Sequence, residues 1–248
     1  LFTTVSMACG TGLFTQRGAS SYTAFGQIIC MILMQIGGLS LLSFVGLIAL
    51  QARKKLSFVN LATLQESFSR ADTKNFQGFI FSVFRFTFAI EGLGALLLAF
   101  HFVPKFGWGK GLFTSAFLAV SAFCNAGFDN MGATSLVDYV KNPYINLIIA
   151  SLIIMGGLGF SVWFDFQGRL DKRQTGHKLS FHTKIVLGLT ATILTVGTLL
   201  TLVTEYNNPD TIGNFSFGHK VLASFFQTVT MRTAGFATID YTQARPIS

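Results

Sequence analysis

The chain is dominated by long stretches in which apolar residues follow one another without a charge. The longest covers residues 18–52, where 35 consecutive positions carry no Asp, Glu, Lys or Arg. Residues 142–164 and 185–204 add uncharged runs of 23 and 20 residues, and residues 79–103 form a fourth run with only two charged positions. A helix crosses the hydrocarbon core of a bilayer with about 20 apolar residues. The pattern therefore predicts an all-α membrane protein with four spans in these ranges.

A shorter uncharged segment lies between two of the predicted spans. Residues 111–128 hold 18 positions without a charge and end in the sequence Asn125-Ala126-Gly127-Phe128. Because the spans on either side run in opposite directions, this segment must enter and leave the membrane on one side. Re-entrant backbone is tolerated only where protein or a water-filled cavity surrounds it, since an unpaired peptide group in lipid costs several kcal/mol. The segment therefore indicates a path for something polar.

Similar glycine motifs end three apolar segments of the chain. The three tripeptides are Gly10-Thr11-Gly12, Asn125-Ala126-Gly127 and Thr233-Ala234-Gly235. Their last glycines are 115 and 108 residues apart, a periodicity that indicates duplicated units. Glycine pairs recur in the spans that follow the first two motifs, at residues 37–38 and 156–157. Paired glycines allow helices to approach closely, so these positions are expected to be sites of tight packing.

The three motifs share a chemistry that suits cations. Their side chains are small and uncharged, so backbone carbonyl oxygens can approach an ion. A dehydrated K⁺ needs a ring of such oxygens to replace its hydration shell. Glycine permits the backbone angles that this arrangement requires. The helix expected ahead of each motif would direct the partial negative charge of its C-terminal end toward the path.

Basic residues are concentrated in two linkers between the predicted spans. The chain is 51% hydrophobic and only 11% charged, with a net charge of +8. The two linkers hold ten basic residues, which are Arg53, Lys54, Lys55, Arg70, Lys74, Arg169, Lys172, Arg173, Lys178 and Lys184. The other linkers hold few lysines among acidic residues, so the positive-inside rule places the ten-charge linkers in the cytoplasm and the glycine motifs outside. Membrane topology explains the charge without nucleic-acid binding.

The scattered cysteines and histidines do not indicate catalysis or a resident metal. The three Cys and four His residues lack paired spacing, and no nucleophile–base arrangement repeats, which argues against an enzyme. The alternative to a pore is a carrier-type cation symporter with a binding site at the membrane midplane. Such carriers are often built from inverted repeats, whereas the motifs here recur in parallel.

Four stretches of the sequence resemble a known transporter superfamily: SAFCNAGF, TVTMRTAGFATID, FGQIICMILMQIGGL and SFHTKIVLGL. They are similar to the Trk/Ktr/HKT superfamily of K⁺ transporters, and most closely to the KtrB-type membrane subunit. The resemblance implies repeated membrane–pore–membrane units around a pseudo-fourfold ion pore, incomplete in this chain. It identifies Gly12, Gly127 and Gly235 as filter glycines, with K⁺ at the backbone carbonyls of the three tripeptides. It also implies K⁺ uptake by a multi-pass protein of the plasma membrane, with Na⁺ as a second ion that drives or activates uptake.

The same resemblance implies a division of the chain and a set of partners. The expected divisions are residues 1–55 (end of repeat 1, with its pore segment and inner helix), 56–78 (cytoplasmic linker), 79–166 (complete repeat 2), 167–183 (cytoplasmic linker) and 184–248 (partial repeat 3, with its outer helix and pore segment). A fourth repeat and the gating loop are expected outside this chain. The expected partners are membrane lipid, a second copy of the protein in a homodimer, and a cytosolic, KtrA-like ring of nucleotide-binding regulatory subunits docked on the basic linkers.

Two charged residues are candidates for support of the filter. Glu91 lies in the middle of a predicted span, where a charge costs roughly 3 kcal/mol unless it finds a partner. Arg232 directly precedes the third tripeptide and is the only cation in the longer stretches VSMACGTGLF, VSAFCNAGFDN and TVTMRTAGFAT that contain the three motifs. One hypothesis pairs Arg232 with Glu91 or Glu205 behind the filter, and the other gives a neutral Glu91 a local hydrogen bond. The first motif departs from the family pattern at Cys9 and Gly10, so its part of the filter is expected to be more flexible.

Overall fold

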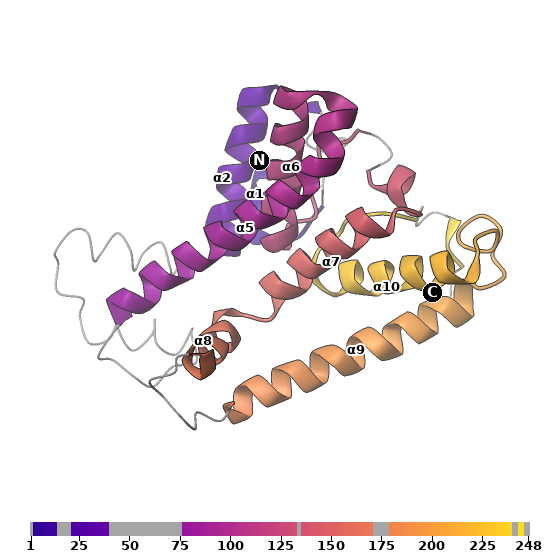
Figure 1. Ribbon diagram of the computed structural model, residues 1–248. Coiled ribbons are helices and arrows are strands. Elements are labelled where there is room, and N and C mark those ends of the chain that lie inside the picture. Colours follow the sequence, from indigo (N-terminus) through magenta and orange to yellow (C-terminus); the bar gives the residue numbers. More distant parts are fainter. Residues whose placement is uncertain are drawn as a thin grey trace.

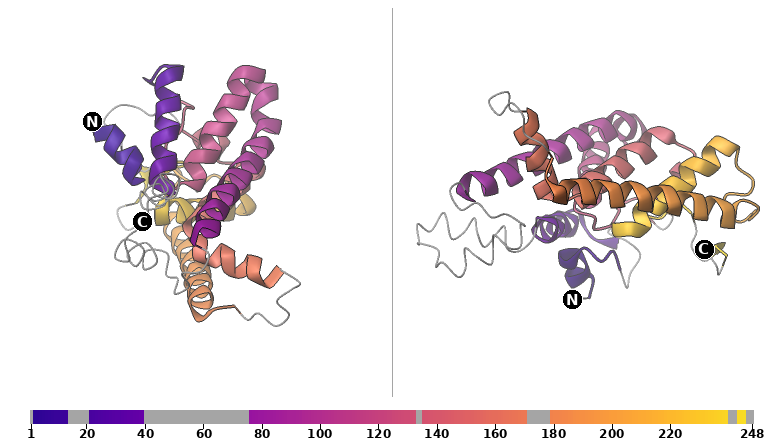
Figure 2. Two further views of the ribbon diagram at one scale, coloured as in Figure 1. Left: turned by 90° about the vertical axis from the view of Figure 1, so that its left-hand side faces the viewer. Right: turned by 90° about the horizontal axis from the view of Figure 1, so that it is seen from below.

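The computed structural model describes residues 2–13, 21–39, 76–132, 135–170, 179–239 and 243–245. These residues form helices and connecting loops, and no strand occurs within those ranges. The two longest helices are α5 (Phe76–Phe106) and α9 (Phe181–Glu205), and Figure 1 shows α7 and α10 between them. Both views in Figure 2 keep α5 beside α6 and α9 beside α10, pairs that are in contact. The protein is an all-α membrane protein.

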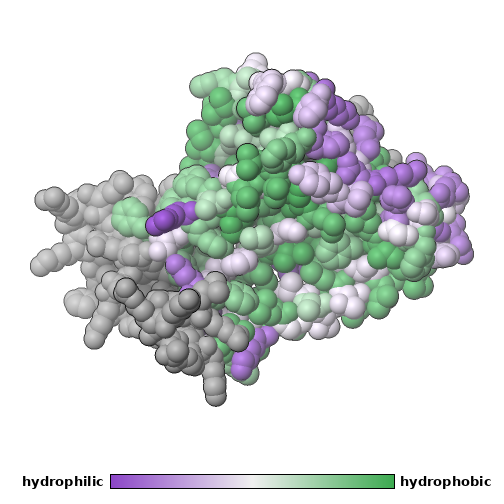
Figure 3. Space-filling view, viewed as in Figure 1, coloured by the Kyte–Doolittle hydropathy of each residue, from purple (hydrophilic) through white to green (hydrophobic). Residues whose placement is uncertain are grey.

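Helices α5 and α9 correspond to two of the predicted spans. Within them, residues 81–106 and 181–205 are long and apolar enough to cross a bilayer. Helix α9 exposes large apolar side chains along its length, such as Leu189 and Val203, which are 58% and 74% exposed. Figure 3 shows an apolar surface over much of the visible face. This distribution suits a helix that faces lipid on one side.

The predicted span over residues 142–164 is not one continuous helix. It forms α7 (Pro143–Gly157) and α8 (Phe160–Leu170), which meet at an angle of 93°. Gly159 lies at the break with a φ of +85°, a backbone conformation that glycine adopts at little cost. The indole N–H of Trp163 donates to the carbonyl oxygen of Met155 at 2.9 Å and so satisfies one acceptor near the end of α7.

The first predicted span is described only in part. Its described portion contains α2 (Ala24–Gly38), a helix of 15 residues, and residues 40–52 of this predicted span lie outside the described residues. Helix α2 begins after Thr23, whose side chain accepts from the backbone N–H of Gly26. Asn142 and Ser180 cap the starts of α7 and α9 in the same way. Polar N-caps of this kind typically stabilise a helix by about 1 kcal/mol.

Three shorter helices end at the glycine motifs. They are α1 (Phe2–Cys9), α6 (Trp108–Phe123) and α10 (Phe217–Thr233). The 16 residues of α6 measure about 24 Å, which is less than the roughly 30 Å thickness of a bilayer core. Helix α6 folds back on α5 after Gly107. Gly111 of α6 packs against the backbone of Val103 in α5, because a Cβ built on Gly111 would lie only 2.6 Å from the Cα of Val103. This close pair agrees with the expected re-entrant segment.

The core lies where α5, α6, α7 and α10 meet. Its fully buried side chains include Phe102 of α5, Leu118 of α6, Ile149 of α7 and Phe226 of α10. A second cluster joins α1 and α2 to α6 through Met7, Met34 and Phe117. Because both clusters include α6, the C-terminal part of this helix is enclosed by protein, as the irregular backbone that follows it requires.

Candidate functional site

The three glycine motifs come together in space. A Cβ built on Gly12 would lie 3.0 Å from the carbonyl oxygen of Ala234 and 3.2 Å from that of Ala126. A Cβ on Gly127 would collide with the Ala234 carbonyl and lie 2.9 Å from the Cα of Gly235. The structure thus brings the three predicted glycine segments into direct backbone contact, although they are far apart in sequence.

The first two segments leave their helices in the same conformation. Gly10 and Asn125 have φ values of +64° and +54°, in the left-handed region. The next residue in each segment donates its backbone N–H to a carbonyl five residues back: Thr11 to Ser6 at 3.0 Å and Ala126 to Ser121 at 2.9 Å. This pattern is a Schellman motif, in which Gly or Asn is favoured at the left-handed position. The shared ending explains why these positions hold Gly10 and Asn125.

The third segment is held by a side chain instead. The hydroxyl of Thr230 accepts from the backbone N–H of Gly235 at 3.1 Å and donates to the carbonyl of Phe236 at 2.9 Å. Gly235 itself has a φ of +114°, a conformation essentially confined to glycine. The first segment also uses a hydroxyl, because Thr11 donates to the buried Ser6 side chain at 2.8 Å. Each segment therefore has its own polar support behind it.

A side-chain hydrogen bond joins the second and third segments directly. The hydroxyl of Thr233 donates to the amide oxygen of Asn125 at 2.8 Å. The amide nitrogen of Asn125 donates to the carbonyl of Phe123 at 3.2 Å, which fixes the orientation of the side chain. The bond therefore links positions two residues before Gly127 and Gly235.

The glycine pairs of α2 and α7 pack against the helices that precede their own motifs. A Cβ on Gly37 would collide with the carbonyl oxygen of Ala8 in α1, and one on Gly156 with that of Phe123 in α6. Ala8 and Phe123 are each four residues before their motif's last glycine. Tight packing was expected at these glycine pairs, and the structure contains it in both places.

Glu91 lies behind the second segment, buried at 4% exposure. Its carboxylate accepts from the side-chain amide of Gln35 at 2.9 Å and from the thiol of Cys124 at 3.6 Å. A local hydrogen bond of this kind was one of the two hypotheses for Glu91. The partners come from α2 and from the end of α6, so Glu91 connects two helices at the base of the segment.

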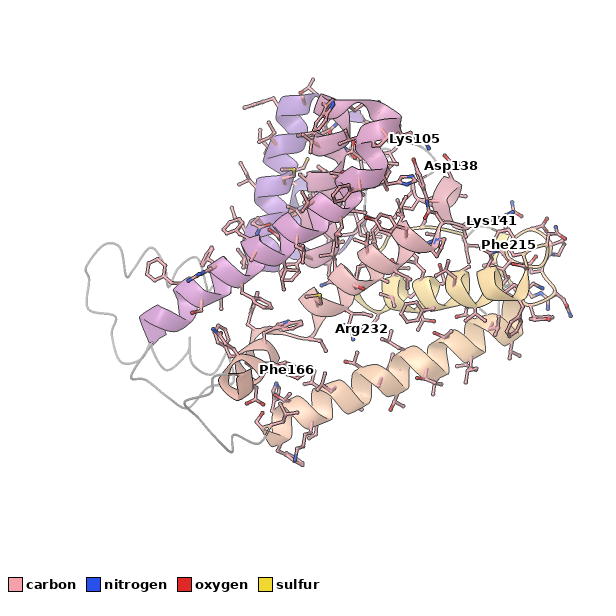
Figure 4. All side chains as sticks on the ribbon, in the orientation of Figure 1. Lys105, Asp138, Lys141, Phe166, Phe215 and Arg232 are labelled. Atoms are coloured by element: carbon pink, nitrogen blue, oxygen red, sulfur yellow. The ribbon has the colours of Figure 1, made fainter. Side chains whose placement is uncertain are left out.

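Arg232 lies behind the third segment, and Figure 4 shows it between α7 and α9. Its Nη1 donates to the hydroxyl of Thr190 in α9 at 3.2 Å, and its buried Nη2 has no hydrogen-bond partner among the residues that the structure describes. Arg232 is in the last turn of α10, where the helix dipole favours a cation. The expected pairing of Arg232 with Glu91 or Glu205 is not formed in the described part of the chain. The carboxylate of Glu205 instead accepts from Asn208 and Thr211.

Sequence reasoning missed the residues that hold the glycine segments from behind. Cys124 was considered only as one of three cysteines without paired spacing, and Gln35, Thr190 and Thr230 were not singled out. The available signal was a polar side chain inside an uncharged span, as at Gln35. Such a side chain needs a hydrogen-bond partner in the membrane, but the sequence does not say which one.

A carboxylate follows the second segment in the loop between α6 and α7. Asp129 is 8% exposed and accepts from the backbone N–H of Met131 at 2.9 Å and from the hydroxyl of Ser135 at 2.7 Å. Burial raises the pKa of the Asp129 carboxyl, and these hydrogen bonds partly offset the rise. Asp129 therefore places a titratable group two residues beyond Gly127.

The described residues form a bundle of apolar helices in which three glycine segments converge, an arrangement that suits a membrane transport protein. The profile of the TrkH family, described as "Cation transport protein", matches residues 1–248. The chain belongs to this family.

Curated relatives cover nearly the whole chain. It is 38% identical over 245 residues to "Ktr system potassium uptake protein B" of Bacillus subtilis, covering 99% of this chain and 54% of that protein. It is 38% identical over 243 residues to "Potassium/sodium uptake protein NtpJ" of Enterococcus hirae, covering 98% and 52% respectively. The Vibrio alginolyticus "Ktr system potassium uptake protein B" is 36% identical over 243 residues, covering 98% and 53%. The chain therefore spans about half the length of these relatives.

Proposed function

We propose that this chain forms part of a pathway for K⁺ uptake across the plasma membrane. The observation that carries the proposal is the contact among three glycine segments that the sequence separates by more than a hundred residues. Each segment follows the C-terminal end of a helix, whose partial negative charge attracts cations. The relatives named for potassium uptake support K⁺ as the ion. On this proposal the protein is a transporter and performs no covalent chemistry.

The proposed selectivity filter uses backbone carbonyls to replace the hydration shell of K⁺. It comprises Gly10, Thr11, Gly12, Asn125, Ala126, Gly127, Thr233, Ala234 and Gly235. In this structure the segments are in van der Waals contact. Passage of an ion requires them to surround a common axis, and a fourth segment outside this chain would complete that ring. This is the pseudo-fourfold arrangement of repeats proposed for the whole protein.

Glu91 and Arg232 are the proposed supports of the filter. Glu91 holds the end of α6 through Cys124, and Arg232 holds the end of α10 to Thr190. Neither side chain needs to touch the ion, since each contacts the helix that carries a filter segment. They would keep the carbonyls in place while ions pass.

The proposed topology places the glycine segments toward the outside. Figure 4 shows Lys105 and Lys141 at one end of the molecule and Phe166 of α8 at the other, next to the cytoplasmic linker proposed at residues 167–183. On the family plan, residues 79–166 form a complete repeat, which contains α6, α7, most of α5 and the first part of α8, and residues 1–55 and 184–248 are parts of two others. We also propose a homodimer and a cytosolic nucleotide-binding ring that docks on the basic linkers. Those linker residues fall largely outside the described part of the chain.

Sodium is the proposed second ion. The relative from Enterococcus hirae is named for both potassium and sodium uptake. In the proposed mechanism Na⁺ either accompanies K⁺ or activates its passage. Measuring Na⁺ uptake together with K⁺ uptake separates the two, because only coupled transport moves Na⁺ in proportion to K⁺.

The test of the proposed function is uptake by the complete protein in cells that lack their own K⁺ transporters. We expect growth at low K⁺ and K⁺ uptake that persists with excess Na⁺ as competitor. Absence of uptake from protein present in the membrane would refute the function. Recording in planar bilayers addresses the alternative mechanism: unitary currents support a pore, whereas saturating flux without unitary currents supports a carrier.

A further inference from the structure

The second glycine of each pair contacts the next motif along the chain. A Cβ built on Gly38 at the end of α2 would lie 2.5 Å from both the Cβ and the Sγ of Cys124. A Cβ built on Gly157 at the end of α7 would collide with Nη2 of Arg232. The first glycine of each pair packs on its own motif's helix, so each pair touches two successive motifs.

The two contacts occupy the same register. Cys124 lies three residues before Gly127, and Arg232 lies three residues before Gly235. Each of these side chains also bonds the long helix that precedes its own motif: Cys124 bonds Glu91 in α5, and Arg232 bonds Thr190 in α9. Glu91 and Thr190 lie equally far before the last residues of those helices. A thiol and a guanidinium group thus make equivalent contacts, each with a glycine pair and with the long helix before its own motif.

We propose that Cys124 and Arg232, three positions before the second and third filter glycines, are positioning residues, through which the glycine pair of the preceding unit sets the geometry of the next filter segment. The proposal rests on the proposed function, because it assigns a role relative to the filter. Cys124 and Arg232 would act through the backbone of the segments and not by touching the ion. A displacement of α2 would therefore displace the segment that follows Cys124, and a displacement of α7 would displace the segment that follows Arg232.

The backbone next to Cys124 makes this transmission effective. Cys124 is the C-cap residue of α6, and its N–H bonds the carbonyl of Val120 at 2.9 Å. The next residue, Asn125, already has a positive φ, so the chain turns sharply at this point. A Cβ on Gly38 would also lie 2.9 Å from the Cα of Cys124. A methyl group added at Gly38 must therefore displace either α2 or the backbone that leads into the filter.

Hydrogen bonds fix the thiol in this position. Sγ of Cys124 lies 3.5 Å from Oε1 of Gln35 and 3.6 Å from Oε1 of Glu91, while Gln35 donates to Glu91 at 2.9 Å. Cys124 is 8% exposed, so water does not readily replace these partners. The cluster of Gln35, Glu91 and Cys124 therefore joins α2, α5 and α6 at one point behind the second filter segment.

A double-mutant cycle in the complete protein tests the proposal. The variants are Gly38→Ala, Cys124→Gly and the two combined, with Gly92→Ala as control because a Cβ there meets nothing within 4 Å. The readout is K⁺ uptake under Na⁺ competition, at measured membrane amounts. We expect each single variant to lose roughly tenfold in K⁺ preference, and the double variant to lose no more than the worse single, because contacting residues are not additive. Gly92→Ala should retain the wild-type preference.

A conservative pair checks the hydrogen bonds separately. Cys124→Ser keeps a donor for Glu91 and Gln35, whereas Cys124→Ala keeps only the Cβ. We expect Cys124→Ser to remain within about threefold of wild-type K⁺ preference and Cys124→Ala to lose more. If Gly38→Ala does not reach the membrane, this pair decides the proposal.

Several outcomes would overturn the positioning role. They are wild-type preference in both single variants, losses that multiply in the double variant, or equal preference in Cys124→Ser and Cys124→Ala. Gly127→Ser is the reference variant: if it alters selectivity while the Cys124 variants do not, the filter stands and the coupling fails. If wild-type protein takes up no K⁺, the proposed function itself fails.

Discussion

Replacement of Gly127 by alanine should damage K⁺ discrimination, and more than the same replacement of Gly12. Gly127 has a φ of +72°, where an L-residue pays roughly 1–2 kcal/mol. Its new Cβ would also collide with the Ala234 carbonyl and lie 2.9 Å from the Cα of Gly235, whereas ordinary contacts begin at 3.4 Å. The third segment must therefore retreat by about half an ångström or more, and the carbonyl that moves is a proposed ligand of the ion.

The expected size of the effect follows from these two terms. A strain of 1.4 kcal/mol corresponds to about tenfold in an equilibrium constant. Because the collision adds to the strain, we expect Gly127→Ala to lose at least about tenfold in preference for K⁺ over Na⁺. Gly12→Ala should be milder, since its Cβ would meet carbonyl oxygens at 3.0 and 3.2 Å. The difference between the two variants is steric, because both glycines have similar positive φ values and so similar backbone strain.

The assay is uptake of labelled K⁺ by the complete protein with increasing Na⁺ as competitor. Gly188→Ala in α9 is the matched control, because a Cβ there meets nothing within 4 Å and no positive φ occurs. Unchanged K⁺ preference in Gly127→Ala, at normal membrane amounts, would refute the reasoning. It would mean that these glycines only allow the chain to turn.

Three further predictions concern topology, the outer loop and the partner. Lys110→Cys and Lys141→Cys should react with an impermeant thiol reagent applied outside, whereas Lys54→Cys and Lys172→Cys should not; the reverse pattern would contradict the orientation of the filter. Because burial raises the pKa of Asp129, its negative charge should be lost at a higher pH than the usual value of about 3.9, so K⁺ affinity should fall as external pH is lowered toward that range. Asp129→Asn should remove this pH dependence, and a dependence that persists in the variant must come from another group. Neutralising the basic residues of both cytoplasmic linkers should weaken co-purification with a nucleotide-binding ring, and unchanged co-purification would assign those charges to orientation alone.

Long apolar runs predicted the helices well because hydropathy and length decide whether a helix can cross a membrane. Helices α5 and α9 coincide closely with predicted spans. The same reasoning did not find the break between α7 and α8, because Gly159 and its neighbours are as apolar as the helices they interrupt. Hydropathy measures the preference of a residue for water or lipid and contains no information about the direction of the helix axis.

The sequence predicted the glycine segments of the candidate site but not the side chains that pack behind them. The three glycine tripeptides could be found because they recur, and recurrence is visible in one sequence. The polar side chains behind them could not, because Cys124 meets Gln35 and Glu91 only after three helices pack together. Arg232 was singled out for its charge, but its charge suggested a carboxylate partner, and the structure gives it the hydroxyl of Thr190. Charge indicates that a group needs a partner and does not identify one.

The three glycine segments belong to one polypeptide, and this has a consequence for how the pathway can evolve. In a channel made of identical subunits, one codon change alters every wall of the pore at once. Here a change at Asn125 or Arg232 alters one wall and leaves the others as they were. If the proposed pore is formed, selection can therefore test asymmetric walls in small steps, and the three motifs already differ at equivalent positions, which hold Gly10, Asn125 and Thr233.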